Sequence, residues 1–224
     1  MRNKEALETR FAIACALKEK ESYRELPFEQ EFAERVSFGY RASNPDAIPD
    51  VVNIHPHSLM ECGNPTQIYV DRLNWGFGLL QDYQVRDVIV SGISGPPGSW
   101  DYDYAKTTGR TLALVAEEWL RESGYTGRIH RVDTGHNTFA TMKAVYEEVV
   151  ASEGFTHVEE VSTYEHLARI HLQGMQVNEL AGKDVKRSFS GPKIRNPATA
   201  LDFMLWELTS AHDTLGFTAE ALKK

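Results

Sequence analysis

Four short runs rich in β-branched residues recur between positions 51 and 161, and segments of helical length separate them. Each run is short and begins and ends with a β-branched residue, as expected of a strand in a parallel sheet. The alternation predicts an α/β protein, a Rossmann-like three-layer α/β/α sandwich with a mostly parallel sheet. The predicted strands are Val51 to Ile54, Val88 to Val90, Ile129 to Val132 and Val158 to Val161.

Amphipathic spacing predicts helices between and after these strands. The helix that follows the second strand is expected to be a single long one that ends near Ser123-Gly124, and the next is expected to end at Gly154. A fifth strand is expected around Met175-Gln176-Val177. Apolar residues face the core in helices that include Tyr69 to Leu80, Ala105 to Trp119 and Phe139 to Val149. A further helix contains His166, Arg169 and Ile170, and a final helix, from about Ala198 to Leu215, buries Leu201, Leu205 and Leu208.

Residues 1–47 have a different pattern from the rest of the chain. Leu7, Phe11, Ala14 and Leu17 recur at helical spacing, and a second helical stretch follows Pro27. A connector with two prolines, residues 42–49, separates these helices from the first strand. We therefore expect an N-terminal helical extension over residues 1–47 and a Rossmann-like domain over residues 48–224.

The composition restricts the class of protein. A chain of 224 residues that is 42% hydrophobic can bury a normal core, and its two cysteines, Cys15 and Cys62, form no metal-binding motif. The formal charge is -8 and no long basic run occurs, so nucleic acid is not an expected partner. No segment approaches the roughly 20 apolar residues of a membrane span. We expect a cytoplasmic protein, and no feature specifies an oligomeric state.

The turn after the second strand is a candidate site, because ligands of open parallel sheets bind beyond the carboxyl ends of the strands. This turn is Ser91-Gly92-Ile93-Ser94-Gly95. Its small residues let backbone N–H groups approach a phosphate or carboxylate, and its hydroxyls can donate as well. The turn lacks the Walker lysine and the GxGxxG spacing, and a tight strand-to-helix turn without a ligand is the alternative.

Polar residues also follow the third and fourth predicted strands. His136 and Asn137 can face the cleft, while Asn137 or Thr138 can cap the next helix, and capping alone is the alternative. After the fourth strand, Thr163 precedes His166 and Arg169, which are three apart on one helix face. Arg169 can hold an oxyanion, and His166 can donate a hydrogen bond or act as a general acid. A surface histidine and an arginine paired with a carboxylate are the alternative.

Other residues give weaker indications. His55 and His57 flank Pro56 and could bind a metal, but no third ligand at a fixed spacing is visible, so no metal is required. Arg72, on the helix after the first strand, can reach the cleft or be solvated. Asp101 and Asp103 could be acid/base groups or a helix cap. Their aromatic neighbours could stack against a ring or simply pack, and these are Trp100, Tyr102 and Tyr104.

Three of these loops, taken in order, resemble a known family. The motifs are Val90-Ser91-Gly92, then Asn137-Thr138, then Thr163-Tyr164-Glu165-His166-Leu167-Ala168-Arg169. Over about residues 50 to 180 the sequence resembles the DUF218 family, also called the YdcF-like or SanA/ElyC-like family, and Arg72 matches an arginine on that family's first helix. The sequence departs from the family at Ile93, where the family has a second glycine, and in the helix that begins at Thr138.

The resemblance implies a Rossmann-like fold that binds a nucleotide-like or phosphorylated ligand. S-adenosylmethionine or another nucleotide is a candidate cofactor. The leading hypothesis is a hydrolase or group-transfer enzyme that acts on a small anionic molecule, with His166 and His136 as catalytic residues. The alternative is a non-catalytic sensor, or an accessory protein of a biosynthetic or envelope pathway. The residues expected to contact the ligand are Ser91, Gly92, Ser94, Gly95, Asn137, Thr138, Thr163, Arg169 and Arg72.

Overall fold

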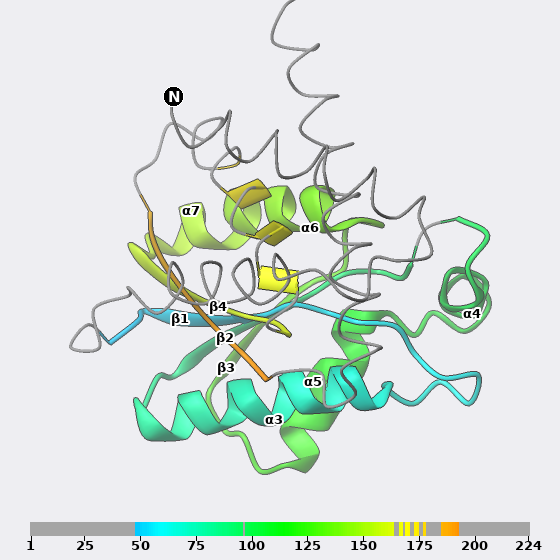
Figure 1. The fold of residues 1–224 in the computed structure, drawn as a ribbon, viewed down its shortest axis with the longest axis horizontal. Helices are drawn as coiled ribbons and strands as arrows, with labels where there is room; N and C mark the ends of the chain where they lie inside the picture. The colour runs from blue at the N-terminus through cyan, green and yellow to red at the C-terminus, as the bar shows by residue number, and fades with distance from the viewer. Residues whose placement is uncertain are drawn as a thin grey trace, which may run out of the picture.

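A computed structural model of the chain describes residues 48–95, 97–163, 166, 167, 169, 170, 173, 174, 177 and 185–192. These residues contain one five-stranded parallel sheet in the order β3-β2-β1-β4-β5 (Figure 1). The α/β Rossmann-like fold and the first four predicted strands are confirmed. The expected N-terminal extension and C-terminal helix lie outside the described residues. The strands are β1 (Val51–Ile54), β2 (Asp87–Ser91), β3 (Arg128–Val132), β4 (His157–Val161) and β5 (Lys186–Ser190).

Helices cover both faces of the sheet. The helices α3 (Gln67–Asp82) and α5 (Leu112–Glu122) pack on one face. The other face carries α6 (Thr138–Ala144), a π-helical turn, η2 (Val145–Val150), and α7 (Ala151–Glu153), while α4 (Trp100–Thr108) lies beyond one end of the sheet (Figure 1). Within the described part of the chain, no helix is long and apolar enough to cross a membrane.

The core has two halves because side chains alternate across the strands. Val52 and Ile54 of β1 face α3 and α5, where they pack with Leu73 and Leu120. Val51 belongs to the opposite half, with residues of α6 and η2 such as Met142. Nearly every side chain of β1, β2 and β4 is buried, as expected of strands covered on both faces.

The long helix predicted after the second strand is wrong, because two helices, α4 and α5, occupy this segment. Gly109 ends α4 in the left-handed region, with φ of 72°, and donates its N–H to the Ala105 carbonyl. Thr111 then caps α5 through its hydroxyl, which accepts a hydrogen bond from the Leu114 N–H at 3.0 Å. The apolar spacing continues across this break, which hid it in the sequence. The predicted ends near Ser123-Gly124 and at Gly154 are confirmed.

The strand predicted around Met175-Gln176-Val177 is also wrong. Gln173, Gly174 and Val177 are helical, and the fifth strand is β5, Lys186–Ser190. The buried residues Leu167, Ile170 and Val177 follow the helical spacing of three and seven and pack in one half of the core. Gly174 interrupts this pattern in the sequence, and the reason for a glycine at that position is a buried arginine described below.

Candidate functional site

The candidate site lies where the chain changes direction across the sheet. From β1 the chain runs to β2 and β3 on one side, and it later returns to build β4 and β5 on the other. The connections after β1 and β4 therefore diverge at the carboxyl ends of these strands, which is where open α/β sheets bind ligands. We call this place the switch point of the sheet. The two segments stay close there, because the N–H of His55 donates to the Val161 carbonyl at 2.9 Å.

Arg72 joins these two segments. Its side chain is fully buried on α3, and Nη1 donates to the carbonyls of Pro56 at 2.5 Å and His55 at 3.3 Å. Nη2 donates to the Thr163 hydroxyl at 2.8 Å, just beyond β4. The planar fork of an arginine suits such divergent contacts. The structure thus brings together Arg72 and Thr163, two residues that the sequence comparison placed at one site.

His166 and Arg169 follow Thr163 by three and six residues, and both are helical. Both side chains are buried, and Nη2 of Arg169 donates to Nδ1 of His166 at 3.3 Å. Burial, followed by the positive charges of Arg169 and Arg72 and the nearby His55, lowers the pKa of His166 well below 6.5. The imidazole is therefore neutral at pH 7. Because Nδ1 accepts a hydrogen bond, Nε2 carries the proton.

Glu160, the last residue but one of β4, is a buried carboxylate that the sequence analysis missed. Its Oε2 accepts hydrogen bonds from Nε2 of His55 at 2.7 Å and from the Asn53 amide at 2.8 Å. Its Oε1 accepts from the Tyr146 hydroxyl at 2.7 Å and from Nε of Arg187 at 3.2 Å. Burial alone would raise the pKa of Glu160, but Arg187, His55 and Tyr146 lower it to about 2. The carboxylate is thus charged and held by four donors.

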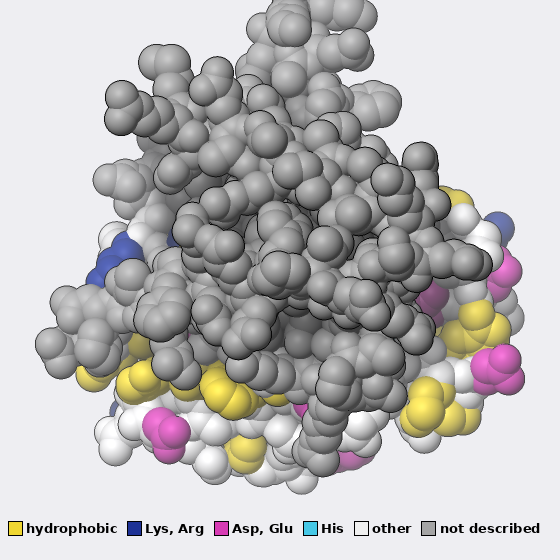
Figure 2. Space-filling view, viewed as in Figure 1, with side chains coloured by type: hydrophobic (Ala, Val, Ile, Leu, Met, Phe, Trp, Pro, Cys, Tyr) yellow, Lys and Arg dark blue, Asp and Glu magenta, His cyan; other side chains and the backbone are white. Residues whose placement is uncertain are grey.

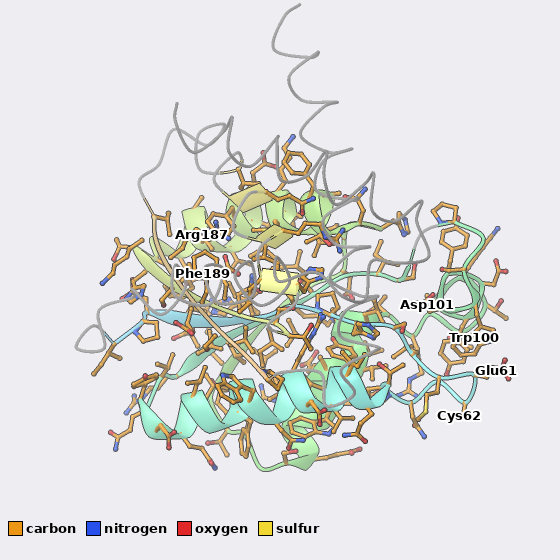
Figure 3. All side chains as sticks on the ribbon, viewed as in Figure 1. Glu61, Cys62, Trp100, Asp101, Arg187 and Phe189 are labelled. Atoms are coloured by element: carbon orange, nitrogen blue, oxygen red, sulfur yellow. The ribbon has the colours of Figure 1, made fainter. Side chains whose placement is uncertain are left out.

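Arg187, on β5, supports this carboxylate from the far side. Its Nη2 also donates to the Ile170 carbonyl at 3.0 Å, and its guanidinium lies over the Phe189 ring, 4.8 Å from the centroid. A Cβ on Gly174 would lie only 1.9 Å from Nη1 of Arg187, so a larger residue there would require the guanidinium to move from its contacts with Glu160 and Ile170. Figure 3 shows Arg187 and Phe189 together, well away from Asp101 and Trp100 at the other end of the sheet.

The sequence did contain a signal for this network. Glu159 and Glu160 are adjacent in a predicted strand that is central in the sheet, where both faces are covered, so two carboxylates must be buried. They point to opposite faces. Glu159 contacts the hydroxyls of Ser188 and Ser190, and burial raises its pKa despite those hydrogen bonds. Glu160 alone reaches His55, so the two glutamates have different environments.

His55 and His57, the candidate metal ligands, contact different parts of the protein. His55 uses Nε2 for Glu160, whereas Nδ1 of His57 lies 2.9 Å from the hydroxyl of Thr66, the residue that caps α3. Among the residues that the structure describes, no group of three or more His, Cys, Asp or Glu side chains is arranged to hold a metal ion. His55 therefore belongs with the switch-point residues through its contact with Glu160.

The glycine-rich turn after β2 uses several of its amides within the protein. Gly92 and Ile93 donate to the carbonyls of Val132 and Gly135, at 3.0 and 3.3 Å. The Gly95 N–H donates to the carboxylate of Asp101 at 3.1 Å, so an acidic side chain of α4 already occupies the position expected for an anion. Ser91, at the end of β2, is fully buried.

A second polar group forms between this turn and the loop after β3. The Ser94 hydroxyl lies 3.2 Å from Nδ1 of His136, whose ring centroid is 5.5 Å from that of Tyr102. The expected cap at Asn137 is confirmed, since its side chain accepts the Ala140 N–H at 2.9 Å, and Thr138 begins α6. The turn after β2 approaches the segment after β1, because a Cβ on Gly92 would lie 3.0 Å from the Pro56 ring.

The outer surface near α4 is aromatic and acidic. The Trp100 ring stacks on the Tyr104 ring with centroids 4.9 Å apart, and Trp100 and Met60 are both exposed. Figure 2 shows hydrophobic and acidic side chains side by side at this end of the molecule, and Asp103 is among the exposed acids. The electrostatics therefore favour an anion at the switch point, near Arg72 and Arg169, over this end.

Comparisons with known proteins add little. No family model matches the sequence, and no curated protein matches it. A crystal structure of a protein from the universal stress protein family from Burkholderia pseudomallei aligns with a TM-score of 0.36 and 13% identity, covering 66% of this chain and 99% of that one. A TM-score of this size supports no inference. The functional assignment therefore depends on the residues described above.

Proposed function

We propose that this protein binds a small phosphorylated or nucleotide-like anion at the carboxyl ends of β1 and β4, and that it acts on this ligand by hydrolysis or group transfer. The observation that carries the proposal is the buried cluster of Arg72, Thr163, His166 and Arg169 at the switch point of the sheet. Buried groups with shifted pKa values are typical of functional sites, and His166 is such a group.

The chemistry of the cluster suits a phosphoryl group. A neutral His166 with its proton on Nε2 can donate a hydrogen bond to an anionic oxygen without adding a charge of its own. The guanidinium of Arg169, in contact with the same ring, supplies positive charge and several donors. Arg72 fixes the positions of the Pro56 and Thr163 segments between which the anion would bind.

We place the anion at this cluster and assign the loops after β2 and β3 to the remainder of the ligand. The amides of Gly92 and Gly95 donate within the protein, which favours His166 and Arg169 as the main anion contacts. Ser94 and His136 form a neighbouring polar pair that can contact an attached ribose or base. An adenosyl ligand such as S-adenosylmethionine would use this second region and gain less from Arg169, since it has no phosphate.

Thermal unfolding with added ligand tests the proposal. Inorganic phosphate, AMP and S-adenosylmethionine should be titrated separately, with affinities taken from the rise in Tm. We expect phosphate and AMP to stabilise the protein and Arg169→Gln to weaken their binding roughly tenfold, the worth of one charge-assisted contact. Arg128→Gln is the matched control, because Arg128 is exposed and pairs with Glu153 at a distance from the site.

The outcomes separate the competing functions. If neither phosphate nor AMP raises the Tm, the proposed function is wrong. If AMP binds and is recovered unchanged after long incubation, the protein is a sensor or binding protein and the catalytic part of the proposal is wrong. Equal effects of Arg169→Gln and Arg128→Gln would mean that phosphate binds at another place.

A further inference from the structure

A buried histidine–carboxylate pair, His55 and Glu160, lies beside the proposed anion site. We propose that His55 is the catalytic base of this site, taking a proton from the attacking nucleophile through Nδ1, and that Glu160 is its positioning residue. The inference rests on the proposed function, because it assigns a role next to the anion that His166 and Arg169 would hold. It adds a residue that no motif of the sequence indicates as catalytic.

The hydrogen bond between the two residues fixes the imidazole. Glu160 is ionised and can only accept, so Nε2 of His55, 2.7 Å away, carries the proton and donates. Nδ1 is then the basic nitrogen. It makes no hydrogen bond with any residue that the structure describes. A neutral histidine whose proton is held by a carboxylate, with its other nitrogen available, has the arrangement of a general base.

The position of His55 relative to His166 fits this role. The two ring centroids are 6.4 Å apart, and the rings are tilted by 43°. A single oxygen atom, about 2.8 Å from a nitrogen of each ring, can bridge this separation. A water molecule next to a phosphoryl group bound by His166 and Arg169 would therefore be within reach of His55.

An ionised carboxylate is costly at this buried position, which supports a role for the charge of Glu160 beyond packing. An apolar residue in a buried strand costs less than an ionised glutamate, which must be surrounded by donors. When His55 takes up a proton, the adjacent carboxylate stabilises the imidazolium. Tyr146 of η2 and Arg187 of β5 hold the other oxygen and keep Glu160 ionised and in place.

For a phosphate monoester the step balances as follows. The water oxygen forms a bond to phosphorus while Nδ1 of His55 accepts a proton from that water. The bond from phosphorus to the ester oxygen breaks, and its electron pair leaves with that oxygen. His55 then releases its proton to the solvent or to the leaving alkoxide, so no further co-reactant is required.

Hydrolysis of p-nitrophenyl phosphate, together with binding of inorganic phosphate, tests the assignment. We expect His55→Gln to lower kcat at least 100-fold while the Kd of phosphate changes less than threefold, as for loss of a general base. Glu160→Gln should lower kcat while the Kd of phosphate changes less than threefold, because the carboxylate positions the His55 imidazole and is not expected to contact the anion. Two matched controls should keep the wild-type rate. In His130→Gln, the replaced histidine pairs with Asp87 at a distance of 2.8 Å, and this pair lies away from the site. In Glu159→Gln, the replaced carboxylate lies on the opposite face of β4.

Several outcomes would overturn the assignment. If His55→Gln keeps more than a third of the rate, or if wild-type protein binds phosphate but does not hydrolyse the ester, His55 is not the base, although the proposed binding function stands. If phosphate does not bind, the proposed function itself is wrong.

NMR gives a readout without turnover. The nitrogen chemical shifts of the wild-type imidazoles should show that His55 is protonated on Nε2, and the opposite tautomer excludes the role of His55 as the base. If Glu160→Gln does not fold, His55→Gln and this tautomer decide.

Discussion

The side chains of Asn53 and Glu160 meet across the β1–β4 pair, where the Asn53 amide donates a hydrogen bond of 2.8 Å to Oε2 of Glu160. Both residues are fully buried, so the carboxylate depends on protein donors in place of water. These donors come from β1, β5, η2 and the loop after β1. One charged group thus holds together elements that are far apart in the sequence, at the end of the sheet where the candidate site lies.

Acid pH should destabilise the protein through Glu160. The folded-state pKa, about 2, is below the ordinary value of 4.5, so the stabilisation is complete above about pH 5 and is lost as the pH falls toward 2. We expect wild-type protein to lose about 2 kcal/mol from this group between pH 5 and pH 3. Urea unfolding at several pH values measures the loss.

Glu160→Gln should lack this part of the pH dependence. At pH 7 the variant should be less stable by about 3 kcal/mol or more, because Arg187 then stays buried without its carboxylate. The stability difference from wild type should narrow as the pH falls. A constant difference between pH 7 and pH 3 would contradict the ionised state of Glu160.

The strands could be predicted from the sequence to the extent that their side chains are apolar. β1 to β4 each contain at least two β-branched residues, whereas β5, with the sequence Lys-Arg-Ser-Phe-Ser, contains none. Polar side chains are tolerated there because β5 is at the edge of the described sheet and because Arg187 finds the buried Glu160. The hydrophobic pattern of the sequence around β5 does not indicate that Arg187 has a buried carboxylate as its partner.

Only part of the candidate site could be predicted from the sequence. Thr163, His166 and Arg169 occur in one short segment, and the family resemblance added Arg72, which the structure places against Thr163. The pair of His55 and Glu160 spans 105 positions and depends on β4 lying next to β1. Strand order decides that contact, and hydrophobic patterning does not specify strand order.

His166 should remain neutral through the physiological pH range. Its pKa is lowered in the folded protein, so the unfolded state binds a proton more readily and stability falls as the pH drops below about 6.5. NMR should show no titration of the His166 ring between pH 6 and pH 8. His166→Gln should remove part of the loss of stability below pH 6.5. A ring that titrates near 6.5 would contradict the burial beside Arg169 and Arg72.

Two glycines of α3 should respond in opposite ways to alanine. A Cβ on Gly76 would lie 2.4 Å from Cδ1 of the buried Ile54, whereas nothing lies within 4 Å of a Cβ on Gly78. Gly76→Ala should therefore destabilise the protein by about 1–3 kcal/mol through overpacking. Gly78→Ala should stabilise it by about 0.5–1 kcal/mol, because alanine has the higher helix propensity. Equal effects in urea unfolding would mean that α3 can move away from β1.

The contact between Arg72 and Thr163 should couple the two halves of the site. Thr163→Val keeps the shape of the side chain and removes the acceptor for Nη2 of the fully buried Arg72, so we expect a loss of about 1–3 kcal/mol in unfolding free energy. The loss should be much smaller in an Arg72→Met background, which defines a double-mutant cycle. Thr156→Val is the control, since its hydroxyl contacts Asp50 at an exposed position and should cost less than about 1 kcal/mol.

The same variant should affect ligand binding. Because Thr163 and Pro56 are held by one guanidinium, its loss lets the segments after β1 and β4 move independently. Phosphate binding to Thr163→Val should weaken several-fold, by less than in Arg169→Gln, because the charge of Arg169 remains. If Thr163→Val binds phosphate as tightly as wild type and shows no coupling with Arg72→Met, Arg72 stabilises α3 alone and does not organise the site.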